Sequence, residues 1–264
     1  MFEFAFDVPL LISGPAIAVI LCLFGLLGML FVRRRVLSRM RVSVEDSEFS
    51  GAILQSVMVF YGLALALLMV NVSQTYGDTG KLLGEESGAL NMLYRDVTSY
   101  PEPLRSDLQG QLSEYTQYVI REAWPLQRRG QVPGRGIDLM SRFQPHLAAF
   151  EPASEGQKLL HAETLRAYNL LIHARRARLD AVNTGLPSVM WAVIVAGAFI
   201  SIGASFFFQV EDARLHGILV VLLSLFVSLV IFMILALDRP FRGDLGLDSG
   251  PYQLVYDQLM KEKG

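Results

Sequence analysis

The residues with the clearest chemistry in this sequence are arginines that flank long apolar runs. Three precede the third run and two follow the fourth: Arg175, Arg176, Arg178, Arg239 and Arg242. Arginines at helix ends attract anions, as charged rings do at pore mouths. We interpret these five residues as an arginine collar that gathers small anions. In the alternative interpretation, Asp238 and Arg239 are a charged stop, and Pro240 ends the helix.

A second set of residues lies on the second apolar run, residues 51–72. Small and polar side chains recur there at helical spacing, and four residues form a candidate ion path: Gln55, Gly62, Ala66 and Asn71. Asn71 marks the interfacial end of the run. Small residues also let helices approach closely in lipid, and a packing surface is the more common meaning of such a stripe. Both interpretations stay open.

Other kinds of chemistry lack the residues that they need. The histidines His146, His161, His173 and His216 form no i, i+4 ligand pair, and Cys22 is the only cysteine. No Gly-rich phosphate loop and no G-x-S-x-G motif occurs. The formal net charge of -2 leaves no long basic patch for nucleic acid. We therefore expect no catalytic residue, metal, cofactor or nucleic-acid partner; an enzyme would need a His/Glu site assembled across helices.

Four apolar runs position these residues. Residues 8–32, 51–72, 186–210 and 215–237 contain no Asp, Glu, Lys or Arg. At about 1.5 Å of rise per residue, 20 helical residues cross a bilayer core of about 30 Å. Only 18% of the chain is charged, against about 25% in soluble domains. We predict transmembrane hairpins at residues 1–78 and 184–240, the second closed by the turn Glu211-Asp212-Ala213-Arg214.

The polar stretch of residues 79–183 is predicted to be a helical insert between the hairpins. Apolar residues recur there at spacings of three and four: Leu83, Leu90, Tyr94, Val97, Leu104, Leu108, Leu112, Tyr115 and Val119. The predicted fold is an all-α membrane protein whose insert is a helical bundle, with its first and last helices extending the second and third spans. Residues 241–264 are predicted to be an amphipathic tail, lying on the membrane surface or on the insert.

The distribution of arginines predicts an orientation. The short loop after the first run contains five: Arg33, Arg34, Arg35, Arg39 and Arg41. Because such loops stay in the cytoplasm, we expect the N-terminus outside and the insert outside the cytoplasm. The arginine collar favours the opposite orientation, but long domains translocate largely regardless of charge.

Four motifs resemble a known family. They are EESGALNMLYR (residues 85–95), YVIREAWP (118–125), HARRARL (173–179) and ALDRPFRG (236–243). These segments resemble the bacterial membrane family called bestrophin-like, over nearly the whole chain. The resemblance implies kinship to bestrophins, which are homopentameric anion channels with four spans and a helical region between the second and third. Bestrophins place that region in the cytoplasm and line the pore neck with bulky apolar residues, whereas this second span has Gly, Ala and Met.

These observations favour an oligomeric integral membrane protein of the bacterial plasma (inner) membrane. Its expected partners are the lipid bilayer, further copies of itself and small anions. In this interpretation the second span lines a path for anions and the arginine collar concentrates them at its mouth. The alternative is a non-conducting scaffold or sensor whose helical insert binds a partner or envelope ligand.

Overall fold

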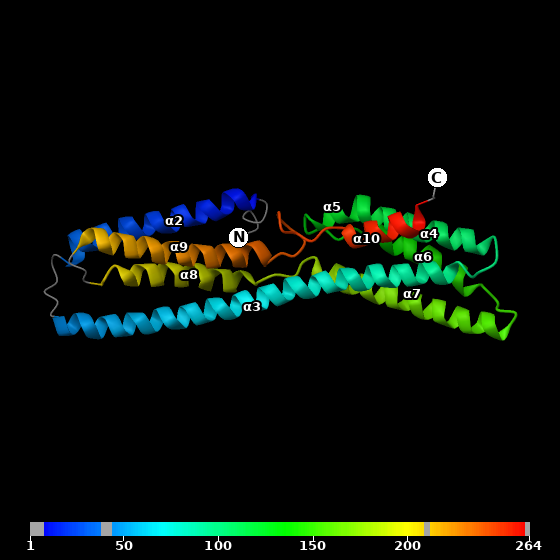
Figure 1. The fold of residues 1–264 in the computed structure, drawn as a ribbon, viewed down its shortest axis with the longest axis horizontal. Helices are drawn as coiled ribbons and strands as arrows, with labels where there is room; N and C mark the ends of the chain where they lie inside the picture. Colours follow the sequence, from blue (N-terminus) through cyan, green and yellow to red (C-terminus); the bar gives the residue numbers. More distant parts are fainter. Residues whose placement is uncertain (1–7, 38–43, 209–211, 262–264) are drawn as a thin grey trace. The chain divides into compact units, whose positions relative to one another are not determined.

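The computed structural model describes residues 8–37, 44–208 and 212–261, and within them all regular structure is helical (Figure 1). The helices are α2 (Leu10–Phe31), η1 (Val32–Leu37), α3 (Val44–Val97), α4 (Leu104–Tyr118), η2 (Val119–Ala123), α5 (Trp124–Gln127), α6 (Arg135–Ala148), α7 (Glu155–Ala181), α8 (Ser188–Ser205), α9 (Ala213–Leu237), α10 (Gly250–Val255) and η3 (Tyr256–Met260). The predicted all-α fold is confirmed.

Within the described residues, four helices are long and apolar enough to cross a membrane. They are Leu10–Val36, Leu54–Val97, Ser188–Ser205 and Ala213–Leu237. Each includes most of one apolar run of the sequence. Arg39, Arg41 and Glu211, which entered the predicted topology, lie outside the described residues.

The chain divides into two units. Unit 1 comprises Met1–Gln74 and Gly185–Asp238, and unit 2 comprises Thr75–Thr184 and Arg239–Gly264. Helix α3 contributes to both units, its first part to unit 1 and its last part to unit 2. The tail after α9 belongs to unit 2, together with the helices of the insert.

Unit 1 contains the apolar helices, which approach each other at small residues. Helix α2 packs against α9 and α8, and these two also contact each other. Gly25 of α2 leaves room for Val220 and Ser224 of α9, as expected of helix contacts in lipid. The hairpin pairing predicted for the first two spans is not confirmed.

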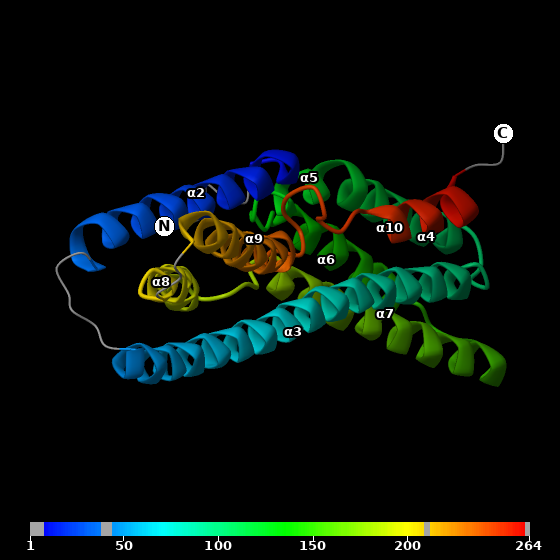
Figure 2. The ribbon, with the colours of Figure 1, turned by 60° about the vertical axis from the view of Figure 1, so that its left-hand side comes forward.

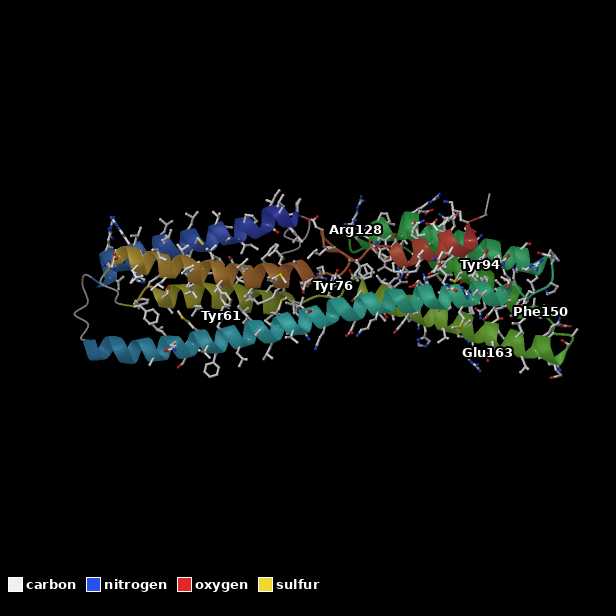
Figure 3. All side chains as sticks on the ribbon, in the orientation of Figure 1. Tyr61, Tyr76, Tyr94, Arg128, Phe150 and Glu163 are labelled. Carbon is white, nitrogen blue, oxygen red and sulfur yellow. The ribbon has the colours of Figure 1, made fainter. Side chains whose placement is uncertain are left out.

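Helix α3 reaches α8 through one aromatic side chain. The Tyr61 hydroxyl donates a hydrogen bond to the Ile194 carbonyl over 2.7 Å, and its ring lies against Gly197 (Figure 3). A side chain at Gly197 would occupy the position of that ring. The small residue on α8 therefore admits the tyrosine that joins the two helices.

The end of α9 is tied to the start of α8 by a buried carboxylate. Asp238 is 2% exposed, and it accepts hydrogen bonds from the Leu186 backbone N–H (2.6 Å) and the Trp191 Nε1–H (3.0 Å). Hydrogen bonds offset the cost of burying the charge. Asp238 thus holds two helix ends together.

Unit 2 has its own apolar core, and the tail is part of it. Its fully buried members include Leu90 and Leu93 (α3), Leu108 and Leu112 (α4), Phe143 and Leu147 (α6), Leu171 (α7) and Tyr252 (α10). The tail lies along α4 in both views (Figures 1 and 2), where Gln117 donates to the Tyr256 hydroxyl over 2.9 Å. Apolar residues at helical spacing therefore bring the tail onto the insert.

A bidentate ion pair lies inside this apolar core. Arg178 of α7 bonds Glu86 of α3 through Nε–Oε2 (2.5 Å) and Nη2–Oε1 (3.1 Å). Their side chains are 1% and 0% exposed. Arg178 also donates to Gln127 over 2.6 Å, and the Tyr115 hydroxyl donates to Glu86 over 2.7 Å. The Arg178 guanidinium is 5.6 Å from the ring centroid of Tyr252.

Arg178 stays positively charged and the Tyr115 hydroxyl stays protonated in this network. Burial disfavours the charged guanidinium, but the Glu86 carboxylate outweighs that effect and raises the pKa of Arg178. Burial, followed by the Glu86 charge, raises the pKa of the Tyr115 hydroxyl, which remains a donor. One ion pair and its neighbours therefore join α3, α4, α5, α7 and α10.

Removing the Glu86 charge tests this role. Glu86→Gln leaves Arg178 buried without a counter-ion, so we expect a loss of about 3–5 kcal/mol in the free energy of unfolding. Thermal or denaturant unfolding of the detergent-purified protein measures the loss. Glu163→Gln is the matched control, because it breaks an exposed pair with Arg166 (67% and 61% exposed side chains), where about 0–1 kcal/mol is expected. Equal losses in the two variants would contradict the assignment.

Candidate anion site

The membrane part of α3 has a face that no described residue of this chain covers. Gln55, Gly62 and Ala66 are all exposed. A Cβ built at Gly62 meets no atom within 4 Å. Gln55 and Gly62 are seven residues apart, about two helical turns, so they share a face. The uncovered face suits either a water-filled path or contact with another subunit.

Asn71 does not share that face. It is nine residues beyond Gly62, about two and a half turns, which places it on the opposite side of α3. Asn71 is exposed as well. The candidate ion path therefore retains Gln55, Gly62 and Ala66 as one continuous stripe, and Asn71 lies apart from it.

The residues of the arginine collar have different environments. Arg178 is buried and paired with Glu86, so its charge is neutralised within the core. Arg239 donates from Nη1 to the Asn183 carbonyl (3.0 Å), and Arg242 donates from Nη2 to the Arg129 carbonyl (3.0 Å). Carbonyl groups carry no net charge, so these two bonds orient the guanidinium groups without neutralising them.

Two turns hold Arg242 in place. Arg128, labelled in Figure 3, returns a hydrogen bond from Nη2 to the Gly243 carbonyl over 3.1 Å. Gly130 has φ +73° and Gly243 has φ +72°. Only glycine adopts this left-handed conformation at little cost. Each turn thus contributes an arginine to the other's backbone, and a glycine allows each turn to form.

Arg175 and Arg176 line a cavity of about 630 Å³ between α6 and α7. Arg175 is half-buried and Arg176 is exposed. Neither makes an ion pair or hydrogen bond with any residue that the structure describes. Asn183, whose carbonyl accepts from Arg239, lines the same cavity. Two arginines of the collar, Arg175 and Arg176, therefore line this cavity, and Arg239 is hydrogen-bonded to a third residue of its lining.

Three histidines have ordinary hydrogen-bonding partners. His161 Nδ1 is 2.8 Å from the Tyr100 hydroxyl, and His216 Nε2 is 3.0 Å from the Ser205 carbonyl. His146 lies 2.7 Å from Asp107 on the surface. Among the residues described, no three His, Cys, Asp or Glu side chains are placed to hold a metal ion.

Sequence reasoning missed the Glu86–Arg178 pair and the apolar wall of the cavity. A signal for the pair was present: Glu86 falls within the apolar stripe that includes Leu83 and Leu90. A carboxylate on a core-facing stripe requires a buried partner. The wall had no such signal, because it combines α6, α7 and the loop before α6.

Comparison with known families shows to which protein family the chain belongs. A profile of the bestrophin-like domain matches residues 19–252. The chain belongs to the bestrophin-like domain family. A search of the curated proteins found no match.

Solved structures share the fold of this bestrophin-like chain. Two point mutants of a bacterial bestrophin homologue from Klebsiella pneumoniae superpose with TM-scores of 0.70 and 0.68, each at 10% sequence identity. The first match covers 96% of this chain and 99% of the homologue, and the second covers 92% and 96%. A mutant described as a membrane protein superposes with TM-score 0.67 at 11% identity, covering 92% and 96%. At such identities the likeness shows the fold.

The turn at Gly130 gives a test of the Arg242 position. A Cβ at Gly130 meets the Arg242 guanidinium, and the left-handed conformation adds about 1–2 kcal/mol of strain. We expect Gly130→Ala to lower the free energy of unfolding by at least that amount. Gly110→Ala is the control, since Gly110 is exposed on α4 with no atom within 4 Å of its Cβ position; it should be neutral or stabilising by about 0.5–1 kcal/mol. Equal stability of both variants would exclude a strained turn.

Proposed function

We propose that this bestrophin-like protein is an oligomeric channel for small anions. The observation that carries the proposal is the uncovered face of α3. Gln55 lies on this face among apolar membrane residues, and an amide facing hydrocarbon without a hydrogen bond is costly. In a ring of subunits the same face lines a water-filled path, and the cost disappears. The fold shared with bestrophin homologues supports this arrangement.

The arginines supply the preference for anions in this proposal. Arg175 and Arg176 have no acidic partner among the residues described, and Arg239 and Arg242 donate to backbone carbonyls. A concentration of one sign of charge raises the local concentration of counter-ions. Arg178 has no part in this effect, because Glu86 compensates its charge.

A non-conducting sensor is the second candidate. Helix α3 continues without interruption from unit 1 into unit 2. Through Glu86, this helix is bonded to the centre of the unit 2 core. Binding of a partner to unit 2 would therefore act directly on a membrane helix, without any ion path.

We propose the bacterial inner membrane as the location, with the first loop in the cytoplasm. Arg33, Arg34 and Arg35 support this orientation, because short arginine-rich loops stay inside. The bestrophin pattern is the reverse. Single cysteines at Ser154 and Lys261 in a Cys22→Ala background decide between them: labelling of intact cells by an impermeant maleimide is expected, and protection of both sites overturns the orientation.

Ion flux into liposomes tests the channel. We expect chloride flux from the purified oligomer and a chloride-to-sodium ratio at least roughly fivefold lower in Arg176→Glu, since one unit charge contributes about 1 kcal/mol in water and the substitution changes the charge by two units. Arg142→Glu is the matched control on α6, where the side chain is 62% exposed and lies 3.6 Å from Glu114. That variant should keep the wild-type ratio.

A second variant addresses the path itself. Gln55→Leu should lower flux while the oligomer remains intact, because it removes the polar group from the membrane stripe. An oligomer without flux would refute the channel and favour the sensor. Flux with unchanged selectivity in Arg176→Glu would refute the role of the arginine collar but not the channel itself.

A further inference from the structure

Arg175 is held in an unusual position on the wall of the α6–α7 cavity. Its Nη2 lies 3.0 Å from the position that a Cβ would occupy at Gly136, and a Tyr118 ring carbon is equally close to it. The absence of a side chain at Gly136 therefore lets the guanidinium rest against α6. Burial raises the pKa of Tyr168, and the charge of Arg175 opposes that rise. The positive charge of Arg175 therefore acts on a side chain that lines the cavity.

Other arginines of α6 and α7 have acidic partners that Arg175 and Arg176 lack. Arg135 contacts Glu122 at 2.7 Å, Arg166 is paired with Glu163, and Arg178 is paired with Glu86. Arg175 and Arg176 have no such partner in the described part of the chain. A half-buried cation without a partner is unfavourable, so a bound anion would stabilise it.

The same cavity contains one acidic residue. Asp180 lies one turn beyond Arg176 and lines the cavity, yet it forms no ion pair with either arginine. Two arginines against one aspartate leave the lining with an excess of positive charge.

Five apolar residues line the cavity, beside the polar residues Ser141, Gln144, Tyr168 and Asn183. Val132 and Ile137 are 46% and 57% exposed, and Met140, Ile172 and Leu179 complete the apolar wall. Exposed apolar residues gathered around a cavity indicate a binding surface. A volume of about 630 Å³ falls within the range of small-molecule sites, about 300–1,000 Å³.

We propose that the α6–α7 cavity binds an anionic amphiphile, whose carboxylate or phosphate head contacts Arg175 and Arg176 and whose hydrocarbon chain lies on the apolar wall. An inorganic anion would leave the wall hydrated, and a neutral lipid would leave the arginines unpaired. Only a molecule with both parts satisfies both surfaces. This site does not depend on ion conduction and would exist in a non-conducting protein.

The lipid bilayer around a membrane protein contains molecules of this kind. A free fatty acid and an anionic phospholipid share the required chemistry, so the experiment must distinguish them.

Equilibrium binding of radiolabelled dodecanoate to the full-length protein in phosphatidylcholine nanodiscs tests the proposal. We expect saturable binding that empty nanodiscs lack, and at least tenfold weaker competition by acetate and by dodecanol. Arg175→Gln/Arg176→Gln should weaken dodecanoate binding at least tenfold, and Ile137→Ser about threefold. Arg166→Gln, which removes one positive charge from an exposed arginine of α7, should bind like the wild type. Competition by phosphatidylglycerol in the nanodisc identifies a phospholipid as the ligand, and its absence identifies a fatty acid; either result supports the site.

Several results would overturn the proposal. Unchanged dodecanoate binding by the double arginine variant would show partition into the bilayer alone, and an equal loss in Arg166→Gln would show a general effect of charge. Acetate binding as tight as dodecanoate would exclude the apolar wall. A double variant that changes oligomer size, with no dodecanoate binding by the wild type, would assign the cavity to a second copy of the chain. The thermal unfolding temperature of each variant is compared with that of Ile137→Ser. This comparison identifies any loss of dodecanoate binding that is caused by misfolding.

Discussion

The buried pair of Glu86 and Arg178 is the interaction on which the architecture of unit 2 depends. Apolar helices can slide along one another at little cost, but a bidentate ion pair in a dry core has one satisfactory geometry. This pair is completed by Gln127 and Tyr115, and the Tyr252 ring lies against the guanidinium. The residues come from five helices, the tail among them. Loss of either charge leaves the other uncompensated in the core.

That pair also determines which arginines are available for function. Arg178 and Arg175 are one helical turn apart on α7, yet one is matched by a carboxylate and the other faces a cavity without a partner. Arg239 and Arg242 are oriented by backbone carbonyls. The family relationship and the uncovered face of α3 support the proposed ion transport, and Arg175 and Arg176 would give such a path a preference for anions.

The features predictable from sequence are those that depend on local pattern. Uninterrupted apolar runs predict the four membrane helices, and spacings of three and four predict the helices of the insert, because both follow from the helical repeat. Motifs such as ALDRPFRG indicated the family, but the role of its Asp238 depends on Leu186 and Trp191, far away in sequence. Sequence likewise could not show that Arg178 is ion-paired and Arg175 is not, because this difference depends on contacts between α3 and α7. The position of Asn71, in contrast, was predictable from sequence. It is nine residues from Gly62, and a helix with 3.6 residues per turn places the two on opposite faces.

The most direct test of this account is the position of bound anions. Crystals of the oligomer soaked in bromide should show anomalous density beside Arg175 and Arg176 and none beside Arg178, because the last is enclosed with Glu86. Bromide at Arg178, or its absence from the α6–α7 cavity at saturating concentration, would contradict the division of the arginines on which the account rests.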